Sequence, residues 1–415
     1  MRLLIAGWVF PISQPPIPDG AIAIEAGAIV AVGARTELRR RFPQAQRTEF
    51  PDAALLPGLI NCHTHLELPV DPDHGPEPFV PWVVRLIARR RGADPDTATQ
   101  TADAGVQALL RSGTTTVADV STTGCSAEPI RRAALRAMVF REVLGVQASQ
   151  AAERIGAAAE AIRKLQDATR GSRVTIGISP HSPYGLSEPL LDACRRLVVD
   201  NALPTTIHAA ESPAEVAYVR DGTGPIPDIL YPAVGCPEPL PRRSARSPIA
   251  YLDSFGLLER ALVVHAVHVD EADGRLLAAR GARVVHCPRS NRRLSEGEAP
   301  VAMLQAHGIP VGLGTDSLAS SASLDLWDEM RAVDLPAAQA LALATLGGAR
   351  ALGWDRQIGS ITPGKRADLI AVSADALRGS HPEVGLLECT RNVEMLWSMV
   401  EGGLVFAQPG VAACA

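Results

Sequence analysis

Residues 54–65 read ALLPGLINCHTH, an apolar run of strand length that ends in two histidines separated by one residue. Seven later segments repeat this texture of a short apolar run followed by polar residues. They are GTTTVADV, AMVFREVLG, VTIGISPH, LPTTIHAAE, ALVVHAVHV, ARVVHCPRSN and IPVGLGTDS. Helical stretches lie between them, such as AAERIGAAAEAIRKLQDA at 151–168. Eight strand and helix units in succession predict a parallel sheet closed into a (β/α)8 TIM barrel, a fold of the α/β class.

The two ends of the chain have a different texture, with short strands and turns and few helical stretches. The N-terminal end contains LLIAGWVF and AIAIEAGAIVAVG, and the C-terminal end contains GSITPGKRADLIAV and LWSMVEGGLVFA. Glycines and a Pro-Gly pair mark the turns. We therefore predict a small composite β-sandwich built from residues 1–56 and 359–415, and a barrel over residues 57–358.

Composition limits the partners and the compartment. The chain has 415 residues, 47% of them hydrophobic, and a net charge of −5. Its arginines are scattered, which argues against nucleic acid and for a small-molecule partner. The apolar segment at 3–10 is shorter than a membrane span and has no cleavage site after it. Seven cysteines without a Cys-x-x-Cys pair favour reduced thiols, so we expect a cytoplasmic protein that does not enter a membrane.

Polar side chains that can bind metals occur at most of the predicted strand ends. Barrel enzymes place their chemistry at the carboxyl ends of the strands. The residues there are His63, His65, Asp119, Glu142, His181, His208, His265 and Asp316. Any one of these histidines alone is better explained as a structural residue, but several on one rim indicate a site. His63 and His65 lie two apart on an extended segment, so both project to one face and can chelate one ion.

Two carboxylates complete this pattern. Glu211 follows His208 by three residues and can stand beside a metal without binding it, where it could take a proton from an activated water. Asp316, in GLGTDS, can supply an anionic ligand. In isolation, Asp316 could equally be the N-cap of a following helix.

LPGLINCHTHLEL, IHAAES, VVHAVHV, HCPRSN and GLGTDS, in this order, resemble the amidohydrolase superfamily, in particular its mononuclear deaminase and chlorohydrolase branch. The resemblance covers nearly the whole chain, because the ends with TPGKRADLIAV are similar to that family's composite β-sandwich. It implies one divalent metal, with zinc preferred over iron, and it assigns roles to six residues. The implied ligands are His63, His65, His208 and Asp316, with Glu211 as proton shuttle and His265 and Asp316 orienting the activated water.

The lysine content favours one metal over two. Binuclear relatives bridge their metals with a carboxylated lysine or a glutamate at a middle strand. This chain has only Lys164, in a helical stretch, and Lys365, in the C-terminal turn. Glu142 is then the only carboxylate candidate for a bridge, and we interpret it as a structural or supporting group. We interpret His268, three residues after His265, as structural.

Four residues are candidates for substrate contacts. Phe79 and Trp82 could stack on a purine ring, or pack within a helix; Glu67 and His181 could bind ribose hydroxyls, although Glu67 could also be a surface charge. A Pro/Gly-rich run, GTGPIPDILYPAVGCPEPLP, is too long for a simple connection, which favours a lid or entrance loop.

HTHLEL, PHSPYGLS, PRSN and the stretch from IHAAES through GTGPI resemble the aminodeoxyfutalosine deaminases of menaquinone biosynthesis. This resemblance implies attack of water on the ring amidine carbon of an adenine nucleoside and release of ammonia. S-adenosylhomocysteine, methylthioadenosine and guanine-type deaminases remain alternatives, as does hydrolysis of an amide or carbon–halogen bond. A non-catalytic binding protein is disfavoured because Glu211 would have no use there. A homodimer is compatible with the family.

Overall fold

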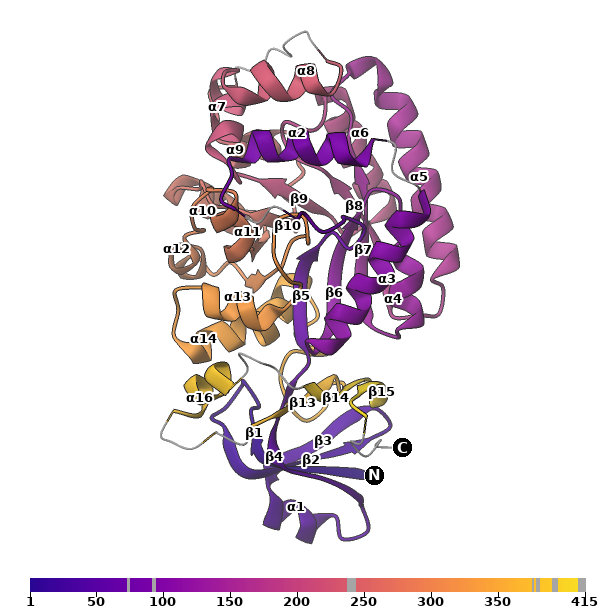
Figure 1. Cartoon of the computed structure of the whole chain (residues 1–415), viewed down its shortest axis with the longest axis vertical. Coiled ribbons are helices and arrows are strands. Elements are labelled where there is room, and N and C mark those ends of the chain that lie inside the picture. Colours follow the sequence, from indigo (N-terminus) through magenta and orange to yellow (C-terminus); the bar gives the residue numbers. More distant parts are fainter. Residues whose placement is uncertain are drawn as a thin grey trace.

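The structure is a computed structural model that describes residues 1–72, 75–91, 95–236, 244–374, 377, 381–389 and 395–409. Two bodies are visible along its long axis, a large strand and helix body and a smaller sheet below it (Figure 1). The chain enters the large body once and returns to the small sheet near its C-terminus. No described helix has the length and apolar character that a membrane crossing requires.

The large body is the predicted (β/α)8 barrel. Its parallel strands are β5 (Leu59–Thr64), β6 (Thr114–Ser121), β7 (Arg136–Val143), β8 (Val174–Pro180), β9 (Thr206–Ala209), β10 (Leu262–His265), β11 (Arg283–His286) and β12 (Val311–Leu313). They form two four-stranded sheets, ordered β5-β6-β7-β8 and β12-β11-β10-β9. Bridges between Thr64 and Asp316 and between Ile178 and Thr205 join the edges of these sheets. Each of the eight predicted segments contains one of these strands.

The first predicted segment is divided between the two bodies. Strand β4 (Gln46–Pro57) belongs to the small sheet and β5 to the barrel, and only Gly58 lies between them. A side chain at residue 58 would not fit, because a Cβ atom there would lie 2.0 Å from Thr115 Oγ1. The Pro-Gly pair therefore marks the passage from one sheet to the other.

Helices surround the barrel and one crosses its mouth. They are α2 (Phe79–Arg90), α3 (Pro95–Arg111), α4 (Ala127–Arg132), α5 (Ala151–Ala168), α6 (Glu188–Asn201), α7 (Pro213–Asp221), α8 (Tyr231–Ala233), α9 (Pro248–Ser254), α10 (Glu271–Ala279), α11 (Pro288–Arg293), α12 (Val301–Ala306), α13 (Leu326–Ala332), α14 (Ala337–Ala342) and α15 (Gly348–Leu352). Helix α5 coincides with the helical stretch quoted from the sequence. Helix α2 lies above the ends of β8 and β9, on the side away from the small sheet (Figure 1).

The small sheet unites both ends of the chain, as predicted. Its seven strands have the order β15-β14-β13-β4-β1-β2-β3. Besides β4, its strands are β1 (Arg2–Val9), β2 (Ile17–Glu25), β3 (Ala28–Ala34), β13 (Leu369–Ser373), β14 (Met395–Val400) and β15 (Gly403–Ala407). Helix α1 (Arg35–Arg41) packs on this sheet, whereas α16 (Pro382–Cys389) lies against α13 and α14 of the large body. Apolar clusters cover both of its faces, one around Leu4 and Trp397 and one around Leu3 and Leu38. The division at residues 56/57 and 358/359 stays a proposal.

Candidate active site

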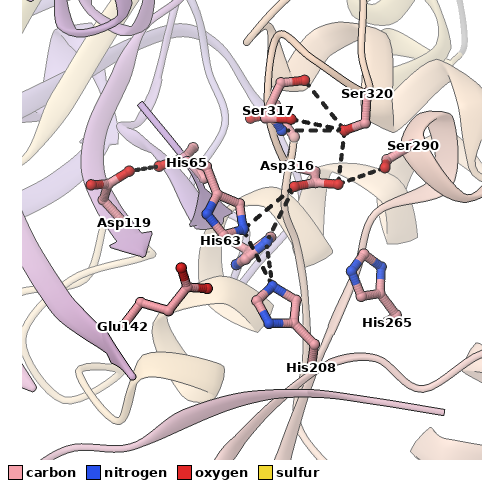
Figure 2. Close-up of polar contacts among 12 residues, drawn as sticks. His63, His65, Asp119, Glu142, His208, His265, Ser290, Asp316, Ser317 and Ser320 are labelled. Atoms are coloured by element: carbon pink, nitrogen blue, oxygen red, sulfur yellow. Dashed lines mark hydrogen bonds and ion pairs between the residues drawn. The ribbon is translucent and has the colours of Figure 1, made fainter. Parts of the chain in front are cut away.

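Four side chains from three regions of the chain meet at the carboxyl end of the barrel. His208 Nε2 lies 3.3 Å from His63 Nε2 and 3.3 Å from His65 Nε2. Asp316 Oδ1 lies 3.4 Å from His63 Nε2 and 3.8 Å from His65 Nε2. Figure 2 shows the three rings and the carboxylate turned toward one another. The structure thus brings together all four residues expected as metal ligands.

The arrangement of donor atoms fits one divalent cation. Donors held about 2.0–2.2 Å from a tetrahedral zinc ion lie roughly 3.3–3.6 Å from one another, close to the separations in this cluster. The remaining ring nitrogen of His208, Nδ1, lies 2.9 Å from the His181 carbonyl oxygen, which leaves Nε2 for the cluster. Burial lowers the pKa of His65 to about 4, so this imidazole is neutral near pH 7 and can offer a lone pair.

Hydrogen bonds also orient Asp316 toward the metal site. Its other oxygen, Oδ2, accepts hydrogen bonds from Ser290 Oγ at 2.6 Å and from Ser320 Oγ at 2.8 Å, as Figure 2 shows. These two bonds direct Oδ1 toward the histidines. Burial alone would raise the pKa of the Asp316 carboxyl, but a hydrogen bond from His63 and the nearby rings of His63, His65 and His265 hold it well below its usual range.

Glu211 and His265 stand beside the four ligands. Glu211 Oε1 lies 3.3 Å from His265 Nε2, and both side chains are buried. Burial raises the pKa of Glu211 well above its ordinary value and lowers that of His265. A carboxyl with a raised pKa can both accept and return a proton near neutral pH. The geometry therefore agrees with the predicted roles of these two residues.

Two of the site residues have left-handed backbone conformations. His265 has φ +73° and Asp316 has φ +56°, values that non-glycine residues seldom adopt. Both residues come at or just after a short barrel strand. Such conformations persist where the surrounding structure enforces them, and here they turn the side chains toward the metal ligands.

The sequence did not identify several residues that support the site. Asn291 Oδ1 lies 2.8 Å from His265 Nδ1, beside Ser290 in the motif PRSN, which was noted only as a resemblance. Glu215 is buried, and its two oxygens accept hydrogen bonds from the backbone N–H groups of Ala210 and Glu211. A polar residue just after a strand end was the available signal for Asn291. Nothing in the sequence near Glu215 distinguished it from an ordinary first-turn acid of α7.

A cavity of about 380 Å³ opens above the metal ligands. Phe79, Trp82 and His181 line it, as expected for residues that contact a substrate. Trp82 also packs, because its Nε1 donates to the Ala319 carbonyl oxygen at 3.0 Å. Trp82 is thus packed within the protein and also faces the cavity, and its stacking on a purine ring stays a prediction.

Glu67 requires a correction, because it is not among the described residues that line the cavity. Its carboxylate accepts hydrogen bonds from Ser121 Oγ, from the Thr122 backbone and from Thr123, and it pairs with Arg90 at 3.2 Å. These partners lower its pKa to about 2 although it is buried. Glu67 anchors the loop after β6 to Arg90 at the end of α2.

The remaining candidates from the sequence are Asp119, His268 and the proposed lid. Asp119 accepts hydrogen bonds from Thr64 Oγ1 and from the Leu66 backbone, so it supports the segment that carries His65. His268 is half-buried and is not among the described residues that line the cavity. The middle of the proposed lid lines the cavity, through Leu230, Tyr231, Val234 and Cys236, and its last part, from residue 237, lies outside the described residues.

Comparison with known proteins identifies the family. The model of the amidohydrolase family matches residues 54–405, and that of a bacterial imidazolonepropionase-like composite domain matches residues 20–45. A 5-methylthioadenosine/S-adenosylhomocysteine deaminase of Syntrophobacter fumaroxidans is 33% identical, covering 97% of this chain and 92% of the relative. The enzyme of the same name from Desulforudis audaxviator is 31% identical, covering 89% and 84%.

Solved structures share the fold over the whole length. A zinc-bound adenosine deaminase of Xanthomonas campestris has a TM-score of 0.80 and 28% identity, covering 100% of this chain and 94% of that one. The aminofutalosine deaminase of Helicobacter pylori has a TM-score of 0.84 and 23% identity, covering 98% and 100%. The family match, with the ligand cluster at the barrel mouth, decides the assignment: this chain belongs to the amidohydrolase family of enzymes.

Proposed function

We propose that this chain is a metal-dependent hydrolytic deaminase of adenine nucleosides. The observation that carries the proposal is the position of Glu211 and His265, 3.3 Å apart, beside a four-donor metal site at the base of a cavity. A proton-transfer group next to an activated water is what addition to an amidine carbon needs. Relatives of about 30% identity are named as deaminases of adenine nucleosides, which supports the same reaction.

Each residue of the site has its own role in the proposed reaction. The four ligands would hold one divalent cation, for which we favour zinc over iron, and such an ion would lower the pKa of a water towards neutrality. Glu211 takes a proton from the water and gives it to the ring nitrogen next to the attacked carbon. His265 and Asp316 hold the attacking oxygen. The new C–O bond forms, the exocyclic C–N bond breaks, and the amine leaves as ammonia after receiving the second proton of the water.

The lining of the cavity favours, as the substrate, a nucleoside with a substituent at the 5′ position. Beyond the metal ligands it is lined by apolar side chains that an adenine ring alone would not fill, namely Leu86, Ile87, Leu144, Val146, Leu230 and Val234. Methylthioadenosine matches this apolar lining, and the names of the curated relatives favour it together with S-adenosylhomocysteine.

Aminodeoxyfutalosine is the second candidate substrate, and with it a place in menaquinone biosynthesis. Its support is the motif resemblance of HTHLEL, PHSPYGLS and PRSN. Arg90 and Arg154 line the cavity and could meet an acidic substituent of such a nucleoside. A cytoplasmic location and a homodimer remain parts of the proposal.

The test combines metal analysis with ammonia release. Purified protein is analysed for zinc and iron and incubated with adenosine, methylthioadenosine, S-adenosylhomocysteine, aminodeoxyfutalosine and, as controls, guanine and a chlorotriazine. We expect about one metal per chain and ammonia from at least one adenine nucleoside. Glu211→Gln should keep the metal and lose about 10²–10⁴-fold in kcat. Metal without ammonia from any adenine nucleoside would contradict the proposal.

A further inference from the structure

Glu142 lies in the cavity at the end of β7, and the proposed chemistry leaves it without a role. It is 6% exposed and lines the cavity together with His65, His181 and His208. Thr122 Oγ1 donates a 2.8 Å hydrogen bond to Oε2. Among the described residues the structure gives no partner to Oε1, and this oxygen is not one of the fully enclosed unpaired atoms. Figure 2 shows the carboxylate pointing toward the histidines.

Glu142 is not needed as a metal ligand. One of its oxygens, a ring nitrogen of His181 and a ring nitrogen of His208 lie within 4.8 Å of one another, which could hold an ion in principle. His208, however, already turns Nε2 toward His63 and His65, and its Nδ1 contacts the His181 carbonyl. It has no nitrogen left for a second ion, so Glu142 and His181 remain available to a ligand.

The position of Glu142 corresponds to the sugar of a nucleoside. The reacting ring must lie by Glu211 and His265, which follow β9 and end β10. Glu142 and His181 lie on the neighbouring side of the mouth, at the ends of β7 and β8. Leu144, Gln147 and Gln150, which follow Glu142 along the chain, line the same cavity. A substrate that extends from the ring into the outer cavity must pass Glu142 with the group next to its ring.

We propose that Glu142 determines specificity by accepting a hydrogen bond from a ribose hydroxyl, with His181 beside it. This assignment rests on the proposed deamination of adenine nucleosides and gives Glu142 the contact that the sequence suggested for Glu67. Thr122 fixes one carboxylate oxygen, so the other is already oriented for the hydroxyl. A buried hydrogen bond to a carboxylate contributes about 10-fold to 100-fold in kcat/KM when its partner is removed.

The test pairs changes in the enzyme with changes in the substrate. Wild type, Glu142→Gln and Glu142→Leu are assayed with adenosine, 2′-deoxyadenosine and 3′-deoxyadenosine, and the metal content of each protein is measured. Wild type should lose about 10-fold to 100-fold in kcat/KM on one of the two deoxynucleosides. Glu142→Leu should lose a similar factor on adenosine and little more on that deoxynucleoside. Glu142→Gln, which keeps an acceptor oxygen, should be intermediate.

Glu160→Gln is the matched control, because it removes one carboxylate from an exposed position on α5. It should leave all three activities unchanged. Equal losses of Glu142→Leu on all three nucleosides would overturn the assignment to a sugar hydroxyl, and so would loss of the metal. If wild type releases ammonia from no adenine nucleoside, the proposed function itself fails. Turnover by wild type combined with either of the first two results refutes the role of Glu142 alone.

Discussion

The hydroxyl of Ser290 donates a 2.6 Å hydrogen bond to Asp316 Oδ2, while Oδ1 of the same carboxylate lies 3.4 Å from His63 Nε2. The bond connects α11 with the residue that follows β12, so two neighbouring strand and helix units share one metal ligand. Ser320, which follows Asp316 in the chain, donates a second hydrogen bond to the same oxygen. Asp316 therefore has one oxygen held by two serine hydroxyls and one that faces His63 and His65.

Removal of Ser290 should weaken metal binding without unfolding the protein. Groups that orient a metal ligand typically contribute 10-fold to 100-fold to metal affinity. We expect Ser290→Ala to lower zinc affinity by about 10-fold and the double change with Ser320→Ala to lower it further, in competition titrations against a chelator. Ser13→Ala, an exposed serine of the small sheet, is the control. Unchanged affinity in the double variant would contradict this role.

Glu215 should position Glu211 rather than react. It accepts the N–H groups of Ala210 at 3.0 Å and of Glu211 at 2.9 Å. Glu215→Gln would place an NH₂ group against one of them, at a cost of about 1–3 kcal/mol in the free energy of unfolding. We expect kcat to fall at least 10-fold while metal content stays the same. Glu259→Gln, at an exposed site, should change neither quantity, and a Glu215→Gln enzyme with wild-type kcat would refute the idea.

Trp82 should contribute to substrate binding through its ring. Its indole lines the cavity and lies 6.0 Å from the ring of Phe79, centroid to centroid. Trp82→Leu should raise KM by about 10-fold, because an aromatic contact of this kind contributes roughly 0.5–1.5 kcal/mol beyond its buried area. Trp82→Phe should raise KM less, since it loses only the hydrogen bond to Ala319 and part of the ring. Trp8→Phe in the small sheet is the control, and equal KM values for the Leu and Phe variants would argue against a ring contact.

Glu296 should make stability fall as pH rises. Burial, with help from the charge of Glu215, raises its pKa from 4.5 to about 8. Between these two pH values Glu296 is ionised in the unfolded chain and protonated in the folded protein. The unfolded state then binds fewer protons, so the free energy of unfolding falls as pH rises. The contribution of Glu296 to the free energy of unfolding is fully present below pH 4.5 and is lost as the pH approaches 8.

The variant Glu296→Gln removes this titration. We expect its free energy of unfolding, relative to wild type, to be higher at pH 8 than at pH 5 by at least about 1 kcal/mol. Denaturant titrations at the two pH values measure the difference. A gap between variant and wild type that does not change with pH would show that Glu296 ionises normally in the folded protein.

Much of the barrel could be predicted from local sequence patterns. Strands and helices require characteristic patterns of apolar and polar residues in the sequence. All eight barrel strands and the bounds of α5 could be predicted from these patterns. A barrel also places every strand end on one rim, so eight polar residues, His63, His65, His208 and Asp316 among them, could be grouped without knowing any distance. The choice of these four as the metal ligands came from the family resemblance.

The exact partner of each side chain could not be predicted in this way. Glu67 follows β5 and Glu142 lies at the end of β7, but Glu67 is turned into the loop after β6 and Glu142 faces the cavity. The difference depends on where the hydroxyl and backbone donors at 121–123 lie, and these are more than fifty residues from Glu67. The supporting contacts of Ser290 with Asp316 and of Asn291 with His265 likewise join residues that are 26 positions apart in the chain.

The sequence by itself therefore determined the family, the barrel and the residues that can hold a metal. Tertiary structure alone decided which carboxylates face the cavity and which are hydrogen-bonded within the protein. The physical reason is that strand periodicity is a local property, whereas a buried carboxylate takes its role from whichever donors the folded chain brings within hydrogen-bond distance.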